Sequence, residues 1–323
     1  KAPFESILSH GFVVDGKGMK MSKSMGNVIS PDDILKNYGA DILRAWVASS
    51  DYAEDLRIDK SILAQHAESY RKIRNTYRFM LGNLKDNFEQ QDFKKLDFKK
   101  FDELEQYILH KIFYISKSVE TNLKNYNFHK LYKELLNFCT LDLSSFYFDI
   151  RKDVLYCDSL DSKKRKDCVI VLNIILESLL KWFAPILVFT SDEIFSLINN
   201  NRKNIHEHSF VEVPSSWENN ELSDKWDQLF EIKQEANIAI ESKRSSKVIG
   251  SSLEADVKLS LNKKKYDLLK NIDLAEYLIT SKAEKVLYKE DEIKIEVKKA
   301  KGKKCPRCWK ILEQNCKRCS DLL

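Results

Sequence analysis

Apolar residues recur at helical spacing through the middle of the chain. One stripe joins Phe101, Leu104, Ile108, Ile112, Ile115 and Val119, and a second joins Phe128, Leu131, Leu135 and Phe138. Residues 61–84, 166–183 and 185–198 also read as helices, and the second of these is the most apolar and therefore the most central. Several amphipathic helices in succession predict an antiparallel helical bundle over residues 61–200.

The first sixty residues follow a different pattern. Residues 10–15 predict a short strand, and residues 16–30 hold glycines among Lys and Ser, which is typical of a loop. Ser30 and Pro31 mark the start of a helix that ends at Gly39, and a second helix begins near Asp41. The order is strand, loop, helix, helix.

The pattern changes again after the Asn-rich run 199–201, which reads as a linker. A helix is expected at 226–243, and apolar and polar residues alternate at 255–261, 285–288 and 293–297. Alternation predicts strands, so this region reads as a small α+β unit.

Composition supports a mainly α protein. The chain has 323 residues with only 8 Gly and 5 Pro, too few for a sandwich with many tight turns. No apolar run approaches the ~18 residues of a membrane span, and no signal pattern precedes the first helix. We therefore expect a cytoplasmic protein without a membrane segment. Because the chain starts with Lys rather than Met, we also expect it to be a piece of a longer one.

The net positive charge is modest, but the basic residues are clustered in the sequence. The net charge is +5, but residues 298–310 carry seven Lys or Arg and no acid. Residues 163–166 and 263–265 form shorter basic clusters. Such patches can face phosphate backbones, although a solvated surface is the simpler interpretation of any one of them.

The strongest chemical signal is the string Lys20-Met21-Ser22-Lys23-Ser24, followed by Met25-Gly26-Asn27. Two lysines three residues apart in a loop of small residues can both reach a polyphosphate, because each is a flexible point charge. The hydroxyls of Ser22 and Ser24 add donors. By composition alone, an exposed turn explains the string equally well.

The string resembles the signature loop of the class I aminoacyl-tRNA synthetases. Two later segments are similar to the isoleucyl, valyl and leucyl enzymes alike: Tyr38–Arg44 with Trp46, and Trp182–Leu187. Two others are similar to the isoleucyl enzymes in particular: Tyr70–Thr76 with Arg78–Phe79 and Gly82–Leu84, and Asn137–Cys139 with Asp142–Ser144.

This resemblance implies the end of a Rossmann-like catalytic domain and an ATP-dependent reaction in two steps, with ATP and Mg²⁺ as cofactors. The isoleucine carboxylate attacks the α-phosphate of ATP, and the aminoacyl group then passes to tRNA. The resemblance assigns Lys23 to the ATP phosphates in the transition state, with Lys20 as its helper and with Ser22 and Ser24 as further ATP contacts. It also implies that tRNA for isoleucine is the partner of a monomeric enzyme.

Part of the family's pattern is not recognisable here. The His-Ile-Gly-His motif is absent, since His10-Gly11 lacks the second His, and neither an amino-acid pocket nor an editing insertion can be identified. We therefore expect the chain to bind tRNA without charging it alone.

Four cysteines at the end of the chain predict a metal site. Cys305 and Cys308, and then Cys316 and Cys319, form two C-x2-C pairs that can complete a tetrahedral thiolate site for Zn²⁺. The cluster resembles the C-terminal zinc finger of the bacterial isoleucyl enzymes, with Trp309 after the second Cys. Only seven residues separate the pairs, which predicts a smaller knuckle. The remaining thiols, Cys139, Cys157 and Cys168, read as ordinary core or surface residues.

We divide the chain accordingly into four parts. Residues 1–60 are the end of the catalytic domain, 61–200 the anticodon-binding bundle, 201–300 an α+β junction and 301–323 the zinc knuckle. A valyl-tRNA synthetase is the near alternative. A non-catalytic RNA-binding module is the distant alternative, which the loop at Lys20–Ser24 argues against because a pure binder needs no phosphate clamp.

Overall fold

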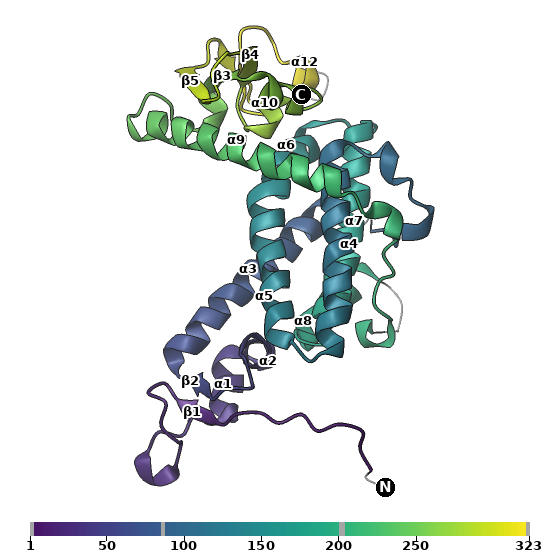
Figure 1. The fold of residues 1–323 in the computed structure, drawn as a ribbon, viewed down its shortest axis with the longest axis vertical. Coiled ribbons are helices and arrows are strands. Elements are labelled where there is room, and N and C mark those ends of the chain that lie inside the picture. The colour runs from purple at the N-terminus through teal and green to yellow at the C-terminus, as the bar shows by residue number, and fades with distance from the viewer. Residues whose placement is uncertain (1–2, 85–87, 200–203, 321–323) are drawn as a thin grey trace. The chain divides into compact units, whose positions relative to one another are not determined.

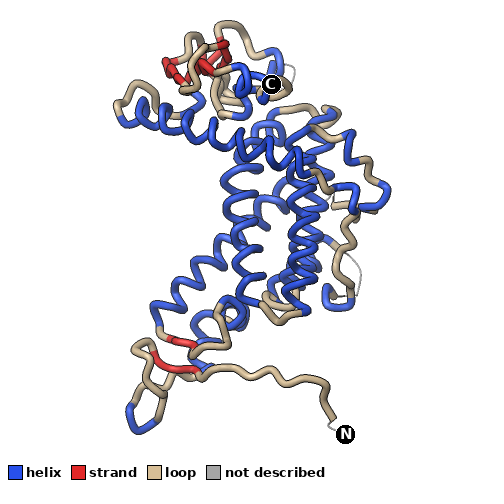
Figure 2. The backbone as a smooth tube through the Cα atoms, viewed as in Figure 1, coloured by secondary structure: helices blue, strands red, loops and turns tan. Residues whose placement is uncertain are grey.

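The computed structural model describes residues 3–84, 88–199 and 204–320, and it is mostly helical, as the sequence predicts (Figures 1 and 2). Asn200 and Asn201 of the predicted linker lie outside the described residues. The chain forms two compact units, each assembled from several segments. The first comprises Lys1–Leu96, Lys111–Ser144 and Val171–Ser215, and the second comprises Asp97–His110, Ser145–Ile170 and Ser216–Leu323. The division into four consecutive domains stays a prediction.

The first unit begins with a small parallel strand pair. Strand β1 (Val13–Asp15) pairs with β2 (Leu56–Ile58), and helices α1 (Pro31–Tyr38) and α2 (Ala40–Ser49) lie between them in the chain. The sequence predicts β1, although at 10–15 rather than 13–15. It gives no sign of β2, whose three residues are too few for an alternation to be read.

Helix α1 has the boundaries that its end residues dictate. The Ser30 hydroxyl accepts from the Asp32 N–H at 3.3 Å, Pro31 occupies the first turn, and Gly39 ends the helix with φ 85°. Beneath it, a small core gathers Ile34 of α1 and Trp46 of α2. Leu56, Ile58 and Leu63 complete this core. Both elements that flank the loop, β1 and α1, therefore belong to a packed part of the first unit.

Long helices follow, and they confirm the predicted succession. They are α3 (Lys60–Leu84), α4 (Glu103–Lys124), α5 (Phe128–Asn137), α7 (Lys163–Phe183) and α8 (Val188–Ile198). Short 3-10 turns occur at Phe93–Lys95, Phe98–Lys100, Ile205–Glu207 and Ser215–Trp217. Helix α8 begins three residues later than predicted, because Pro185 lies in the corner that follows α7.

The helix predicted from Phe128 continues beyond Phe138, the last residue of its apolar stripe. A π-helical stretch (Phe138–Tyr147) joins α5 to α6 (Phe148–Cys157). The Ser144 hydroxyl donates to the Cys139 carbonyl at 2.7 Å, and the Thr76 hydroxyl of α3 reaches the same carbonyl at 3.3 Å. Side chains thus satisfy a carbonyl within a helix whose ladder is irregular.

The second unit contains the 26-residue helix α9 (Asn220–Ser245) and a three-stranded sheet (Figure 1). The central strand β3 (Ala255–Leu261) runs parallel to β4 (Lys282–Leu287) and antiparallel to β5 (Lys294–Lys299). Short helices α10 (Lys263–Leu268) and α11 (Leu274–Tyr277) connect β3 to β4. Strand β3 coincides with the prediction, because its residues alternate between buried and half-buried along its whole length.

No helix within the described ranges combines the length and the apolar character that crossing a membrane requires.

Candidate nucleotide-binding loop and metal centre

The loop that carries Lys20–Ser24 starts with a turn held by one carboxylate. Asp15, the last residue of β1, accepts from the backbone N–H groups of Lys17 and Met19 at 3.0 and 2.8 Å. Gly18 lies in this turn with φ 82°, a conformation that favours glycine. Val14 then forms an antiparallel bridge with Lys20, so the chain enters the motif with a fixed direction.

Asn27 closes the other end of the loop. Its side-chain NH₂ donates to Asp15 Oδ2 at 2.9 Å and to the Lys20 carbonyl at 3.2 Å. Its Oδ1 accepts from the Ser22 N–H at 2.9 Å. The hydrogen bond from Asn27, and then that from the Met19 N–H, hold the pKa of Asp15 below its usual value. One amide therefore ties both ends of the motif to the end of β1.

The motif itself forms a single 3-10 turn, η1 (Lys23–Met25). Ser22 caps this turn, since its hydroxyl accepts from the Met25 N–H at 3.3 Å, and it lies 3.1 Å from the Ser24 hydroxyl. Lys20 and Lys23 are exposed, and neither ammonium pairs with an acid in the described part of the chain. The four predicted residues thus share one short loop whose lysines are available for an anion.

Sequence reasoning gave no role to Asp15 and Asn27, although they hold the loop in shape. Only their positions, at the end of a strand and directly after a glycine, could have suggested one.

The four predicted cysteines meet at the other end of the chain. The sulfur atoms of Cys305, Cys308, Cys316 and Cys319 all lie within 4.8 Å of one another, and those of Cys308 and Cys316 are 3.8 Å apart. A tetrahedral site with Zn–S bonds of ~2.3 Å has sulfur atoms ~3.8 Å apart, so the cluster has the size that such an ion needs. All but Cys316 are buried.

A short hairpin presents the first cysteine pair. Strand β6 (Lys303–Lys304) pairs with β7 (Ile311–Leu312), and the Cys305 N–H donates to the Lys310 carbonyl at 2.9 Å. Gly302 begins the hairpin with φ 119°, and a Cβ there would lie 2.0 Å from the Leu312 carbonyl oxygen. The close approach requires glycine at this position.

Hydrogen bonds within the cluster also shift one thiol toward ionisation. Burial raises the pKa of Cys305, but hydrogen bonds from the backbones of Cys308 and Arg307 outweigh it and bring the pKa to about 7. Burial raises the pKa of Cys308 to about 11 and that of Cys319 further, so a metal ion bound by all four thiolates would have to displace their protons.

The basic residues of the knuckle do not all face the thiolates. Arg318 is paired with Asp153 at 2.7 Å and Asp158 at 3.3 Å, and Arg307 donates to the Tyr156 carbonyl at 3.0 Å. These contacts attach the knuckle to the end of α6. Cys157 lies there too, buried against the cysteine cluster, which places it among core thiols.

Trp309 has an exposed ring and a positive φ of 63°, and the Lys304 ammonium lies 5.5 Å from the ring centre. The indole therefore does not pack into the knuckle.

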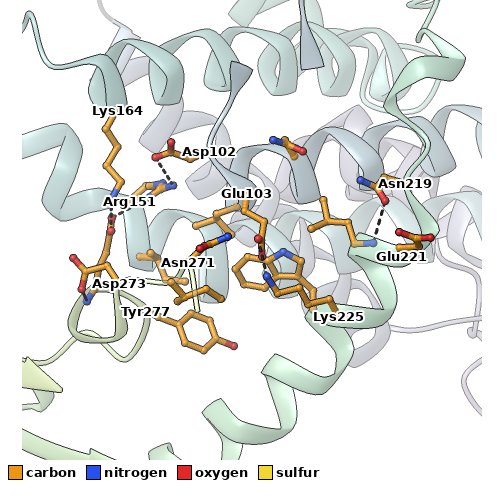
Figure 3. A pocket seen from close by; sticks show the side chains of 17 residues that line it. Asp102, Glu103, Arg151, Lys164, Asn219, Glu221, Lys225, Asn271, Asp273 and Tyr277 are labelled. Carbon is orange, nitrogen blue, oxygen red and sulfur yellow. Dashed lines mark hydrogen bonds and ion pairs between the residues drawn. The ribbon is translucent and has the colours of Figure 1, made fainter. Parts of the chain in front are cut away.

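The second unit also contains a cavity of about 740 Å³ (Figure 3). Ion pairs occupy its polar wall: Arg151 and Lys164 both pair with Glu276, and Lys225 pairs with Glu103 at 2.7 Å. Because these cations are already paired within the wall, the cavity lacks the available positive charge that the Lys20–Ser24 loop offers.

Comparisons with known proteins agree with this geometry. Residues 1–59 match the family model "tRNA synthetases class I (I, L, M and V)", and residues 105–259 match "Anticodon-binding domain of tRNA ligase". In a ternary LeuRS–tRNA–LeuAMS complex from Agrobacterium radiobacter K84, the similar chain aligns with a TM-score of 0.51 and 15% identity. The alignment covers 65% of this chain and 24% of that one, and it shows a shared fold.

Curated relatives are closer in sequence. The isoleucine–tRNA ligase of Pelagibacter ubique is 61% identical over 99% of this chain and 36% of its own length. That of Caldanaerobacter subterraneus subsp. tengcongensis is 40% identical over 97% of this chain and 35% of its own length. The chain thus spans about a third of the curated relatives that it matches. The shared isoleucine name disfavours the valyl alternative, and the chain belongs to the isoleucine–tRNA ligase family of class I tRNA synthetases.

Proposed function

We propose that this chain supplies the ATP-phosphate loop and the tRNA-binding part of an enzyme that joins isoleucine to its tRNA. The observation that carries the proposal is the braced loop, in which Asn27 and Asp15 fix the backbone while Lys20 and Lys23 keep exposed ammonium groups. A binding module without catalysis would need no such arrangement beside a tRNA-binding segment.

In the first step, an isoleucine carboxylate oxygen bonds to the α-phosphorus of ATP, and the bond from that phosphorus to the bridging oxygen of pyrophosphate breaks. Negative charge grows on the phosphate oxygens. Lys23, helped by Lys20, stabilises this charge, and because the loop is already folded the stabilisation requires little rearrangement. Ser22 and Ser24 offer hydroxyls to the same phosphates. Mg²⁺ bound with ATP would neutralise part of the phosphate charge.

In the second step, a ribose hydroxyl of the terminal adenosine of tRNA attacks the isoleucyl carbonyl, and AMP leaves. The match of residues 105–259 to an anticodon-binding model supports the helical bundle, predicted at 61–200, as the part that holds tRNA. Anticodon bases are single-stranded, so aromatic and Arg side chains can stack on them and hydrogen-bond their edges. That the enzyme is monomeric and cytoplasmic remains a prediction.

Zn²⁺ belongs to the same proposal. The separation of the four sulfurs and the burial of three of them support a thiolate site formed by Cys305, Cys308, Cys316 and Cys319. Such an ion would stabilise the fold of residues 301–323 and takes no part in either chemical step.

The loop is tested by Lys23→Ala in the complete enzyme. We expect adenylate formation, measured as pyrophosphate exchange, to slow by ~100- to 1000-fold, with little change in isoleucine affinity, because the lost interaction serves the transition state. Lys17→Ala, an exposed lysine of the same loop outside the motif, is the matched control and should exchange normally. Exchange by Lys23→Ala at the rate of that control would rule out the assigned role.

A further inference from the structure

Helix α2 binds the start of helix α8 through one buried carboxylate. Asp41 accepts from the backbone N–H groups of Phe189 and Thr190 at 3.2 and 2.7 Å and from the Thr190 hydroxyl at 2.6 Å. Asp41 and Thr190 are 6% and 2% exposed, so water does not replace these contacts. The first N–H groups of a helix lack partners within it, and an anion there also suits the helix dipole. Asp41 thus caps a helix 149 residues away.

One turn later on α2, Arg44 binds the other side of the same corner. Its Nε donates to the Ile186 carbonyl at 3.0 Å, and its Nη2 donates to the Pro185 carbonyl at 2.7 Å. Asp41 therefore holds the amides that begin α8, and Arg44 holds the carbonyls just before them. The corner between α7 and α8 thus presents backbone N–H groups to the carboxylate of Asp41 and backbone carbonyls to the guanidinium of Arg44.

Helix α3 reaches this corner as well. Because the Thr190 hydroxyl donates its proton to Asp41, the Tyr70 hydroxyl, 2.6 Å away, must donate to Thr190. Arg74 in turn donates to the Tyr70 oxygen at 3.1 Å. The hydrogen bonds run in one direction from Arg74 to the buried carboxylate of Asp41.

Tyr52, in the loop after α2, makes a second and separate connection. Its hydroxyl donates to the Tyr126 carbonyl at 2.6 Å, at the turn between α4 and α5. Its own carbonyl accepts from the Gly11 N–H at 2.8 Å, just before β1. One residue therefore links the strand that leads into the ATP loop with a turn of the helical bundle.

A path of hydrogen bonds also connects α2 to the loop. The Trp46 indole donates to the Arg57 carbonyl of β2 at 3.2 Å. Strand β2 pairs with β1, and Asp15 at the end of β1 holds Asn27. The contacts lead from the segment that matches the anticodon-binding model to the segment that matches the class I catalytic model.

Apolar packing alone does not fix α2 against the bundle. A cleft of about 520 Å³ lies between α2 and the helices beside it, lined by Leu43 and Val47 of α2 and by Leu131, Trp182 and Pro185. Apolar contact is non-directional and is incomplete here. The angle of α2 therefore depends on its polar contacts, which have fixed geometry.

We propose that Asp41, Arg44 and Tyr52 are positioning residues, which set the tRNA-binding helices relative to the ATP loop so that a tRNA bound by the bundle brings its terminal adenosine to the adenylate. This inference rests on the proposed function. Adenylate formation needs no tRNA, whereas transfer depends on where the bound tRNA ends. A misplacement of ~1 Å can cost ~100-fold in rate, so the two steps should respond differently.

The test uses the complete enzyme and compares Asp41→Asn and Tyr52→Phe with wild type. Three quantities are measured: pyrophosphate exchange without tRNA, tRNA affinity by filter binding, and single-turnover transfer from preformed isoleucyl-adenylate to tRNA. We expect exchange and affinity within ~2-fold of wild type and transfer slowed at least ~10-fold. Asp33→Asn, an exposed acid of α1, is the matched control and should leave all three unchanged.

Thr190 supplies a conservative pair. Thr190→Ser keeps the hydroxyl that donates to Asp41 and should transfer at the wild-type rate, whereas Thr190→Val should be slow. The double variant Asp41→Asn/Thr190→Val should be no slower than the worse single variant if both act through one contact. If Asp41→Asn does not fold, Tyr52→Phe, which loses a single hydroxyl, tests the same inference.

Two outcomes would overturn it. Equal losses in exchange, affinity and transfer would mean that these residues only maintain the fold. Unchanged transfer in both Asp41→Asn and Tyr52→Phe would mean that their contacts do not position tRNA. A wild-type enzyme that neither exchanges nor transfers isoleucine would instead refute the proposed function, so the two failures are distinguishable.

Discussion

Replacing Arg151 tests how much a buried ion pair of the second unit contributes to stability. Arg151 binds Glu105 through two nitrogens, with Nε to Oε1 at 2.6 Å, and it binds Glu276 at 2.6 Å. Glu105 is fully buried, and besides Arg151 it accepts a hydrogen bond from the Tyr147 hydroxyl at 3.1 Å, whereas Glu276 also pairs with Lys164. Arg151→Met would therefore leave Glu105, rather than Glu276, without a cation.

The magnitude follows from that asymmetry. Removing one partner of a buried pair typically costs ~3–5 kcal/mol, because the remaining charge is buried and unpaired. With a urea m-value of ~3 kcal/mol per molar, a loss of ~4 kcal/mol lowers the unfolding midpoint by more than ~1 M. Trp226, which is 2% exposed and stacks on Tyr107 at 5.2 Å, reports unfolding of this region by fluorescence.

Two further variants decide the interpretation. Lys163→Met removes a pair with Asp167 whose lysine is 67% exposed, together with a hydrogen bond to the Lys100 carbonyl at 2.9 Å, and should cost less than ~1 kcal/mol. Adding Glu105→Leu to Arg151→Met removes the unpaired charge and should recover most of the lost stability. If Arg151→Met costs no more than Lys163→Met, or if the double variant is less stable than the single one, the buried charge is not the cause.

Three other predictions concern the metal, the basic tail and the half-buried Lys233. Metal analysis should find about one zinc per chain, and Cys316→Ser should lower that content; an unchanged content would reject the site. Deleting residues 298–323 should weaken tRNA binding and flatten its salt dependence in filter binding, because phosphate contacts release counterions, and equal slopes would leave the tail without a role. Burial lowers the pKa of Lys233 from 10.5 to about 8, so its charge costs stability below pH ~8, and this cost disappears as the pH rises toward 10.5. Lys233→Met removes this cost together with the hydrogen bond from Lys233 to the Tyr277 carbonyl, so in urea denaturation its free energy of unfolding relative to wild type should be ~1–2 kcal/mol lower at pH 10 than at pH 7.

Local signals predicted the elements whose causes are local. Ser30, Pro31 and Gly39 determine both ends of α1, and these signals lie within two residues of the boundaries. The alternation in Ala255–Leu261 predicts β3 because each residue's burial repeats with period two. The meeting of the four cysteines was predictable for the same reason, since each pair needs only its own tight turn.

What the sequence could not predict depends on residues far apart. Strand β2 forms because it pairs with β1, and each of its residues lies opposite a residue that comes forty-three positions earlier in the chain. The π-helical stretch Phe138–Tyr147 departs from the regular α-helical hydrogen-bond pattern. There the Cys139 carbonyl accepts from the hydroxyls of Ser144 and of Thr76, which lies on α3. The ion pairs of Arg318 with Asp153 and Asp158 also required the fold, since Asp153 lies 165 residues before Arg318 in the chain.

The same distinction explains why the Lys20–Ser24 motif is not sufficient for its chemistry. Exposed lysines lower a barrier only if they are already placed when charge develops, and two lysines on a mobile loop would lose that advantage. Asn27 and Asp15 provide the placement locally, and β2, Trp46 and α2 extend it through hydrogen bonds to the corner before α8. The motif identifies which groups meet the phosphates. The long-range contacts determine where those groups are held, and they are therefore where substitutions should separate adenylate formation from transfer.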